Sequence, residues 1–413
     1  MPSLILQLFF WFAVLGLAHT YVIYPIAIRL LARLKTTERR QFTQQDPDHE
    51  WPRLIVLIAA HNEEAVIGAT LDSIFSAEYP TDRFQVIIGS DDATDRTNEI
   101  IEGFQKSHSN LSLRKFTGRN GKIRVINQLV SETRSQSTVF DDSVAILCDA
   151  NVLWSNALPR HLARHFKDPQ VGQVASNVRD ERDLRRGIGD EEQAYVNHEN
   201  LVKHAEGQLF GRMMGAFGAC FAMRAKLLTH VPEHYNVDDF FHTIQTFSEG
   251  YDAIADPKAV CYEDVSEKIS EEFRRKKRIS TGNFQNLKHF FHFLMPWKGG
   301  LTTSLVFWSH KGLRWFGPLL IIAAFVTSAL LALDSSLYLL ALVAQLSGYA
   351  FAVIDGWMDR AGRSGPRLFR YLRYFLVMNL ALLAGGIRFL IGVDNSIWEP
   401  TQRVVSEPES TLS

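Results

Sequence analysis

The sequence predicts an α/β domain with a mixed, mostly parallel sheet, placed between membrane-spanning segments near the two ends of the chain. Three observations predict this fold class. Strand-like apolar runs alternate with helix-like patterns in the polar middle of the chain, which is typical of βαβ units. Several runs are almost entirely apolar, as in strands that are buried on both faces of a parallel sheet. Long uncharged segments near both ends are long enough to cross a bilayer.

Four strands and at least one amphipathic helix are expected in the first half of this middle region. The helix expected at 64–75 places Ile67, Leu71 and Ile74 on one face, at the spacing of an α-helix. Strands that are separated by helices usually run parallel in one sheet. The expected strands are 54–59, 84–88, 111–116 and 144–148.

The first apolar segment, residues 4–28, carries no charge and predicts a transmembrane anchor. Basic residues follow this segment rather than precede it, which is the reverse of a cleaved signal peptide. The positive-inside rule then places the domain that follows in the cytoplasm. The basic residues that follow are Arg29, Arg33, Lys35, Arg39 and Arg40.

Three more apolar segments are expected to span the membrane near the other end, at 315–333, 336–354 and 371–391. The longer link between them carries four arginines and is expected to face the cytoplasm. These patterns predict a multi-pass protein of the inner (plasma) membrane. The expected division is an anchor at 1–35, a cytoplasmic domain at 51–286, interfacial helices at 287–314, transmembrane helices at 315–393 and a tail at 394–413.

The charge balance and the cysteines exclude some classes of protein. The chain has 44 basic and 45 acidic residues, so its net charge of -1 gives no reason to expect a nucleic-acid partner. Its three cysteines, Cys148, Cys220 and Cys261, are far apart and form no C-x-x-C pair. This pattern argues against a disulfide framework or a zinc site and fits a reduced compartment.

Acidic and amide residues follow the expected strands and predict a site. Asp91 and Asp92 follow one strand, and Asp149 and Asn151 follow another, where alternate residues point to one side. Ligands of open α/β sheets bind at the carboxyl ends of strands, and oxygen ligands suit Mg²⁺ or Mn²⁺ bound with a phosphate. The other interpretation is that Asp149 caps the next turn. Asp95, in the same loop as Asp91, is also suited to cap a helix.

Three further motifs carry charge. Lys122 follows a glycine-bearing loop and is placed to reach a phosphate or a base. Asp238 and Asp239 stand beside two phenylalanines, which suits a general base, although acidic residues also favour a helix start. The basic run 274–278 either clamps a diphosphate or contacts anionic lipid. The two interpretations are compatible if Arg275 and Arg278 point inward and Lys276 and Lys277 point outward.

In this order the motifs resemble those of the family 2 glycosyltransferases with a GT-A fold. The resemblance covers about residues 51–285, with weaker likeness beyond, and is to the bacterial membrane-integrated branch similar to cellulose, hyaluronan and poly-N-acetylglucosamine synthases. It implies inverting transfer from a nucleoside-diphosphate sugar, with a UDP-sugar as the first expectation, to a glycan or lipid-linked acceptor. Such transfer would serve polysaccharide, cell-envelope or glycolipid synthesis, with Mg²⁺ or Mn²⁺ as cofactor.

The resemblance also implies a role for each matched residue. The family's metal-binding Asp-x-Asp and its acidic pair with the catalytic base both have counterparts here, and so do its nucleotide-contacting segments. The implied catalytic set is Asp238, Asp239, Arg275 and Arg278, the metal set is Asp149 and Asn151, and the substrate-binding set is Ala60, Asn62, Glu63, Asp91, Asp92, Lys122 and Gly218.

The chain departs from the family pattern at two positions. Asn151 replaces the second metal-binding aspartate with a neutral ligand, and Ile279 stands where the polymerising members have tryptophan. The second change removes an aromatic platform for an acceptor sugar. Four spans are also few for an export channel, so a polymerising enzyme is expected to need a partner subunit. The changes at Asn151 and Ile279 also favour an alternative function. In this alternative the chain is a catalytically silent membrane protein that keeps the fold as a binding or assembly module.

Overall fold

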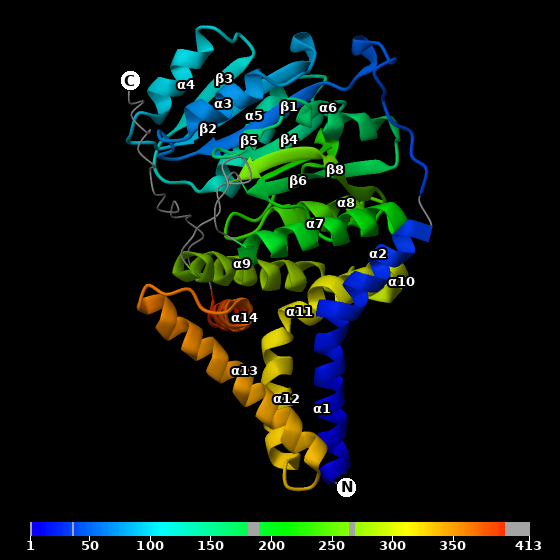
Figure 1. Cartoon of the computed structure of the whole chain (residues 1–413). Coiled ribbons are helices and arrows are strands. Elements are labelled where there is room, and N and C mark those ends of the chain that lie inside the picture. Colours follow the sequence, from blue (N-terminus) through cyan, green and yellow to red (C-terminus); the bar gives the residue numbers. More distant parts are fainter. Residues whose placement is uncertain (1, 35–36, 181–189, 264–268, 393–413) are drawn as a thin grey trace.

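The computed structural model describes residues 2–34, 37–180, 190–263 and 269–392, and the predicted tail at 394–413 lies outside them. A polar domain built on one sheet stands on a narrow bundle of apolar helices (Figure 1). The strands are β1 Leu54–Ala60, β2 Phe84–Asp91, β3 Leu111–Phe116, β4 Val144–Asp149, β5 Leu153–Trp154, β6 Val171–Asp180, β7 Cys220–Arg224 and β8 Asp252–Glu263. The main helices are α1 Pro2–Ala18, α2 Tyr24–Leu34, α3 Ile67–Phe75, α4 Thr97–Gln105, α5 Lys122–Gln136, α6 Leu158–Ala163, α7 Asp190–Phe210, α8 Asp239–Ser248, α9 Ile269–Phe290, α10 Pro296–Phe307, α11 Leu313–Trp315, α12 Gly317–Leu331, α13 Ser336–Arg360 and α14 Arg367–Ile391.

The sheet has the order β3-β2-β1-β4-β7-β6-β8-β5, and the predicted mixed, mostly parallel α/β class is confirmed. The first four strands pair in parallel, β7 runs antiparallel to both of its neighbours, and β6 pairs in parallel with β8. Because β7 is the one reversed strand between β4 and β6, the strands β1, β2, β4, β6 and β8 all end at the same edge of the sheet. Three of these strands extend beyond the expected ends and include Ala60, Asp91 and Asp149.

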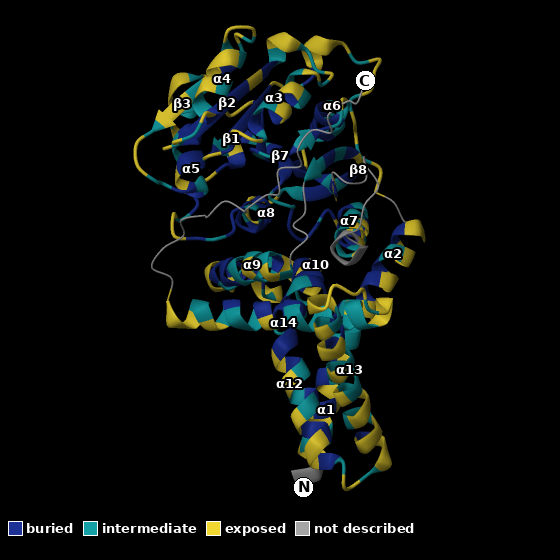
Figure 2. Ribbon diagram, turned by 60° about the vertical axis from the view of Figure 1, so that its left-hand side comes forward, coloured by how far each residue is buried: buried dark blue, intermediate teal, exposed yellow. Residues whose placement is uncertain are grey.

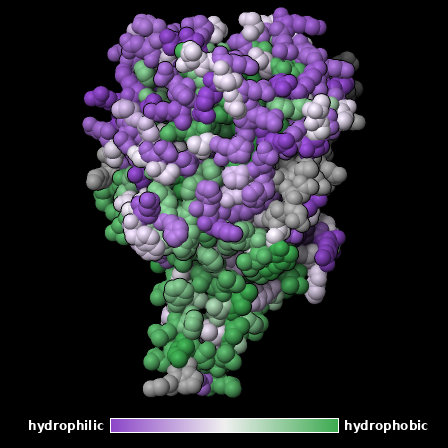
Figure 3. Space-filling model, turned by 180° about the vertical axis from the view of Figure 1, so that it is seen from behind, coloured by the Kyte–Doolittle hydropathy of each residue, from purple (hydrophilic) through white to green (hydrophobic). Residues whose placement is uncertain are grey.

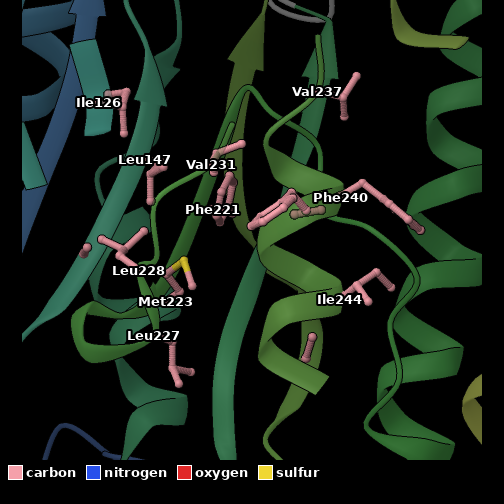
Figure 4. Packing of buried hydrophobic residues seen from close by; sticks show 14 of the residues in the cluster. Ile126, Leu147, Phe221, Met223, Leu227, Leu228, Val231, Val237, Phe240 and Ile244 are labelled. Atoms are coloured by element: carbon pink, nitrogen blue, oxygen red, sulfur yellow. The ribbon is translucent and has the colours of Figure 1, made fainter. Parts of the chain in front are cut away.

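Alternate residues of β1 divide the core between the two faces of the sheet. Ile55 and Leu57 pack on one face, whereas Leu54, Val56 and Ile58 pack on the other, against α3 and α4. The first face meets α5 and α8, and in the close view the side chains of strands β4 and β7 lie opposite those of α8 (Figure 4). This cluster continues without a break into α9, α10 and α11 through Leu287, Phe290, Leu294, Val306, Phe307 and Trp315. The membrane-proximal helices are therefore part of the same core as the sheet.

The apolar helices form the lower part of the molecule. Long, apolar helices able to cross a membrane are Leu4–Leu34, Ser336–Arg360 and Arg367–Ile391, and the pair Pro296–Trp315 and Gly317–Leu331, bent by 64°, makes a fourth if it is one span. The predicted set of one N-terminal and about three C-terminal apolar helices is thus confirmed. The surface of this part is largely hydrophobic, in contrast to the hydrophilic domain above it (Figure 3). The N-terminus and the α12–α13 turn lie at the end of the bundle farthest from the sheet (Figure 1).

The helix α14 is arranged differently from the other apolar helices. It runs across the top of the bundle formed by α1, α12 and α13, beneath the polar domain (Figure 2). It packs along α9, and its Gly385 permits a very close approach, because a Cβ there would lie 2.4 Å from the Cβ of Ser280. Hydrogen bonds fix this contact, since Ser280 Oγ donates to the carbonyl of Leu382 at 2.7 Å.

Candidate active site

A cavity of about 1340 Å³ lies where the strands β1, β2, β4, β6 and β8 end. Its wall also includes residues of α7, α8, α9 and α14, so it extends from the edge of the sheet toward the membrane helices. Most of the residues that the sequence singled out line this one cavity. They are Ala60, Glu63, Asp91, Lys122, Asp149, Asn151, Gly218, Asp238, Asp239, Arg275 and Arg278.

Asn62 and Asp92 are the two predicted substrate-binding residues that the structure does not bring into the wall of the cavity. Both adopt a left-handed backbone conformation, with φ of 52° and 56°. The Asn62 side chain is used locally, because its Oδ1 accepts the Thr94 backbone amide at 2.8 Å. Asp95 in the same loop accepts the amide of Thr97 at 3.0 Å, at the start of α4, as a helix cap does.

Asp91 is buried at the end of β2 and holds the loop that follows β3. Its two carboxylate oxygens accept the backbone amides of Asn120, at 2.7 Å, and Gly121, at 2.9 Å. Gly121 has a φ of 84°, a conformation that favours glycine. The carboxylate therefore fixes the loop that ends at the start of α5. This contact couples the two predicted motifs, because α5 begins with Lys122.

Lys122 reaches from the start of α5 to the end of β4. Its Nζ lies 2.7 Å from Asp149 Oδ1 and 3.8 Å from Asp238 Oδ2. Its low exposure to solvent favours the neutral amine, but the neighbouring carboxylates Asp149 and Asp238 outweigh this effect and raise the pKa of Lys122. The lysine is therefore a fixed positive charge between the predicted metal ligand and the predicted acidic pair.

The acidic pair at the start of α8 divides into two carboxylates with different properties. Burial favours the protonated form of both, but Lys122 lowers the pKa of Asp238. Burial and the charge of Asp238 raise the pKa of Asp239 to about 6, because they outweigh the opposite effect of Lys122 and Lys203. The Asp239 carboxylate lies against Gly218, where a Cβ would be 2.9 Å from Oδ2. Gly218 is thus the residue that leaves room for this carboxylate in the cavity.

The oxygen ligands available to a metal are few. The described ranges contain no group of three or more His, Cys, Asp or Glu residues arranged to hold a metal ion. Asp149 and Asn151 line the cavity, and one oxygen of Asp149 is already bound by Lys122. This sparse set fits a hard cation that takes most of its ligands from water and from substrate phosphates, as Mg²⁺ does.

The basic run on α9 faces the same cavity. Arg275 lies 3.9 Å from Glu263 and 3.5 Å from Glu272, while Arg278 lines the wall near the acidic groups. Lys276 and Lys277 were expected to point outward, but both line the cavity, so this expectation is wrong. The contacts of Lys276 show its direction. Its Nζ pairs with Glu272 at 3.2 Å and lies 4.6 Å from the centre of the Tyr195 ring. The lysine follows Glu272 by four residues, and this spacing places both side chains on one helix face.

The sequence analysis missed two acidic residues at the same edge of the sheet. Asp180 ends β6 and Glu263 ends β8, and the two are paired in the register of these parallel strands. Both line the cavity. Burial is the main cause that raises the pKa of Glu263. Neither strand end was predicted, because the second half of the domain lacks a clear alternation of strands and helices in its sequence.

Lys203 of α7 is a buried lysine that also lines the cavity. Its Nζ lies 3.2 Å from the centre of the Phe217 ring. Burial, helped by the positive charge of Lys311, lowers the pKa of Lys203 to about 7. The structure thus places this lysine beside Phe217, the residue that precedes Gly218.

A buried group of charges joins α7 to the helices below the domain. Glu199 is paired with Arg314, with Lys311 at 2.7 Å and with His310 at 3.2 Å. The other ring nitrogen of His310 lies 2.8 Å from Glu206. A buried charge that loses its partner is strongly destabilising, so these pairs hold α7 and the segment 308–315 in one arrangement.

Comparison with known families identifies the class of protein that this fold and site belong to. The sequence profile described as "Glycosyl transferase family 2" matches residues 55–231, and the profile described as "Glycosyl transferase family group 2" matches residues 147–355. The second match covers half of the chain, and the two together include the sheet from β1 to β8 except for its first residue, Leu54. The chain belongs to the family 2 glycosyltransferases, and the enzyme class that the sequence predicted is confirmed.

This chain is also similar in sequence to individual named proteins, and similar in fold to solved structures. The chain is 33% identical over 184 residues to the beta-monoglucosyldiacylglycerol synthase of Synechocystis sp., covering 42% of this chain and 36% of that protein. It is 24% identical over 239 residues to the poly-beta-1,6-N-acetyl-D-glucosamine synthase of Staphylococcus epidermidis, covering 56% and 54%. The chain therefore spans about a third and about half of these relatives.

One of the similar solved structures is the mannosyltransferase PcManGT from Pyrobaculum calidifontis, described as a complex with GDP-Man and Mn²⁺. Its TM-score is 0.68 at 20% identity, and the match covers 92% of this chain and 99% of that one. At this level of identity the likeness concerns the fold. It confirms the GT-A fold that the resemblance implied.

Proposed function

We propose that this protein is a membrane-bound inverting glycosyltransferase, which moves a sugar from a nucleoside-diphosphate sugar to a glycan or lipid-linked acceptor. One observation carries the proposal. Asp239, a carboxylate whose pKa is raised to about 6, shares a cavity with the cations Lys122, Arg275 and Arg278. A base near neutrality beside cations that can neutralise a leaving diphosphate is what a single displacement of this kind requires.

The proposed step is a direct displacement at the anomeric carbon of the donor sugar. The Asp239 carboxylate takes the proton of the acceptor hydroxyl, and the oxygen of this hydroxyl bonds to the anomeric carbon at the same time. The bond from that carbon to the oxygen of the β-phosphate breaks, and the nucleoside diphosphate leaves with the electron pair. Arg278 and Arg275 neutralise the charge that develops on the leaving group. Asp91 holds the loop and Lys122 on which the nucleotide is expected to rest.

Mg²⁺ or Mn²⁺ is part of this proposal. Asp149 and Asn151 would hold the cation, and a bound cation would supply further positive charge for the diphosphate. The likeness to a structure described with GDP-Man and Mn²⁺ supports a divalent metal. Because Asn151 is neutral and Asp149 is shared with Lys122, the diphosphate itself is expected to complete the metal site.

The cellular setting is proposed from the arginines and the relatives. Arg363 lies in the link between α13 and α14, and Arg360, Arg367 and Arg370 lie in the adjoining helix ends. This group of arginines favours a cytoplasmic domain on the inner (plasma) membrane with several crossings. Two relatives have names that describe a glycolipid product and a polysaccharide product, and these support a role in glycolipid, cell-envelope or polysaccharide synthesis. A UDP-sugar is the first donor to test. If the product is a long polymer, we expect a partner subunit for its export.

The experiment that tests this function measures the release of nucleoside diphosphate. The purified full-length protein, in lipid nanodiscs with Mn²⁺, is incubated with a panel of nucleotide sugars and membrane lipid extract. Release from one donor, dependent on the extract, is expected. A folded protein that binds nucleotide and yet releases no diphosphate from any donor would overturn the proposal. That result would support the alternative of a silent binding or assembly module, which Asn151 favours.

A further inference from the structure

The cavity has a second end, whose chemistry differs from that of the first. Away from the sheet its wall consists mainly of apolar and aromatic side chains from α14 and from segments near the bundle, including Tyr21, Trp315, Phe375, Met378 and Leu382. We call this part the apolar end of the cavity. The same cavity therefore joins the carboxylates at the strand ends to an apolar surface beside the membrane helices.

The apolar end is held at a fixed place relative to the proposed diphosphate clamp. One helix, α9, carries Arg275 and Arg278 and also packs against α14 through Ser280 and Thr281. Thr281 Oγ1 lies 3.2 Å from the carbonyl of Gly385, to which it donates. A molecule seated along α14 would consequently meet the reacting groups on the next turns of α9.

The apolar end opens where α14 begins. Leu368 and Tyr371 line the cavity, and yet they are 61% and 43% exposed, whereas Met378, farther along the same helix, is only 9% exposed. The wall thus passes from exposed to buried along α14. This gradient marks an entrance near Leu368 and Tyr371, at the side of the molecule rather than at the sheet.

This entrance lies at the level where the bundle meets the polar domain (Figures 1 and 2). Two helices at that level, α10 and α14, expose large apolar side chains, such as Trp297 at 72% and Leu301 at 71%. Helices that expose an apolar face beside basic residues lie in the plane of the membrane interface. Leu380 and Ile387 of α14 belong to the same exposed set.

The groups that receive the acceptor determine which kind of lipid fits. Asp238, Asp239 and Glu263 all line the same cavity as the apolar end. A base is useful for a neutral hydroxyl, which must lose a proton, whereas a phosphate acceptor would bring a further negative charge toward this carboxylate pair. The acidic pair therefore favours an acceptor that is uncharged at the reacting oxygen.

We propose that the acceptor is a membrane lipid with a free headgroup hydroxyl, which enters from the interface beneath the first turns of α14. Its hydrocarbon chains lie against the apolar end of the cavity, and its hydroxyl reaches Asp239. This inference rests on the proposed transferase function and specifies the acceptor class for the same site. It assigns α14 as an interfacial helix that forms one wall of the acceptor site.

The test compares acceptors and two tryptophan variants of α14 in the full-length protein. Met378→Trp fills the apolar end, and Leu380→Trp is the matched control, because Leu380 is 57% exposed and does not line the cavity. With dioleoylglycerol in phosphatidylglycerol vesicles as acceptor, Met378→Trp should reduce transfer at least about tenfold. Leu380→Trp should transfer to dioleoylglycerol at the wild-type rate, and its slow hydrolysis of the donor by water, without acceptor, should also be unchanged.

The other acceptors decide the lipid class. A water-soluble disaccharide and undecaprenyl phosphate are tested in parallel, and transfer to either one in preference to dioleoylglycerol would overturn the inference. Normal transfer to dioleoylglycerol by Met378→Trp would also overturn it. Absence of diphosphate release from every donor would instead overturn the proposed function, so the two failures are distinct.

A second measurement does not depend on the folding of a variant. The wild-type protein is labelled with a diacylglycerol that carries a diazirine on one chain, and the labelled peptides are identified by mass spectrometry. Labelling concentrated on residues 368–382 is expected, with competition by unlabelled dioleoylglycerol. Labelling confined to the exposed faces of α12 and α13 would contradict the proposed entrance.

Discussion

The two ends of the cavity are built in different ways. The polar end of the cavity contains Lys122, Asp149, Asp238 and Asp239, which stand at the ends of strands or at the starts of helices. There, charges meet opposite charges over short distances, as Lys122 does with Asp149 at 2.7 Å. At the apolar end, the wall is made by helices that meet through packing, such as α9 and α14. The difference shows that position in the sheet fixes the charged groups, whereas the docking of membrane-level helices shapes the space beside them.

The largest expected effect comes from the base at the polar end. Asp239→Asn keeps the size of the side chain but cannot accept the acceptor's proton, so transfer should fall by about 10²- to 10⁴-fold. Affinity for the nucleoside diphosphate, measured by calorimetry, should change little. Asp82→Asn is the control, because Asp82 is exposed and precedes the start of β2, whereas the cavity lies where the strands end. Wild-type turnover in Asp239→Asn would remove this residue from the reaction.

The second effect concerns the clamp on α9. Arginine contacts phosphate oxygens through a planar fork, which lysine cannot reproduce. Arg278→Lys should therefore reduce turnover on the order of 10²-fold, as does the loss of one oriented donor in other enzymes. Arg96→Lys is a suitable control, because the Arg96 side chain is 75% exposed. If Arg278→Lys is nearly as active as wild type in detergent, Arg278 does not clamp the diphosphate. The basic run is then better explained as a contact with membrane lipid.

A smaller effect is expected at the metal ligands. Asn151→Asp adds a charged oxygen ligand, so the affinity of the apo protein for Mn²⁺ should rise on the order of tenfold. In the wild type, calorimetry should show weak Mn²⁺ binding that becomes strong once the nucleoside diphosphate is present. Tight binding of Mn²⁺ by the wild-type apo protein would show that Asn151 does not face the metal.

The smallest effect is a shift in the pH profile of transfer. The base must be ionised, and its pKa is raised to about 6, so transfer should fall as the pH falls through about 6. Removing the neighbouring charge with Asp238→Asn lowers the pKa of Asp239, and the acidic limb of the normalised kcat profile should move to lower pH. An acidic limb that stays in place or moves upward would show that the two carboxylates do not interact in this way.

The polar end could be predicted from sequence to a large extent because its signals are local. The strand ends at Asp91 and Asp149 are visible as apolar runs that stop in acidic residues, and the spacing of Arg275 and Arg278 places both on one helix face. Glu263 was missed because its strand is irregular in sequence.

The remaining features depend on contacts between distant parts of the chain. The pair of Glu199 with Arg314 joins positions 115 residues apart, and no local pattern indicates it. The orientation of α14 could not be predicted from the sequence either. Hydropathy gives the same signal for a helix that spans the membrane and for one that lies parallel to its surface. The direction of Lys276 was predicted wrongly because its partner Glu272 was not considered.

The central claim is a single displacement, in which Asp239 activates the acceptor and no covalent sugar–enzyme intermediate forms. The most direct test is the anomeric configuration of the product, read from the coupling constant of its anomeric proton by NMR as soon as it forms. The donor is the nucleotide sugar that gives diphosphate release in the panel. A single displacement gives a product whose anomeric configuration is opposite to that of the donor sugar. A product with the donor's own configuration would contradict it.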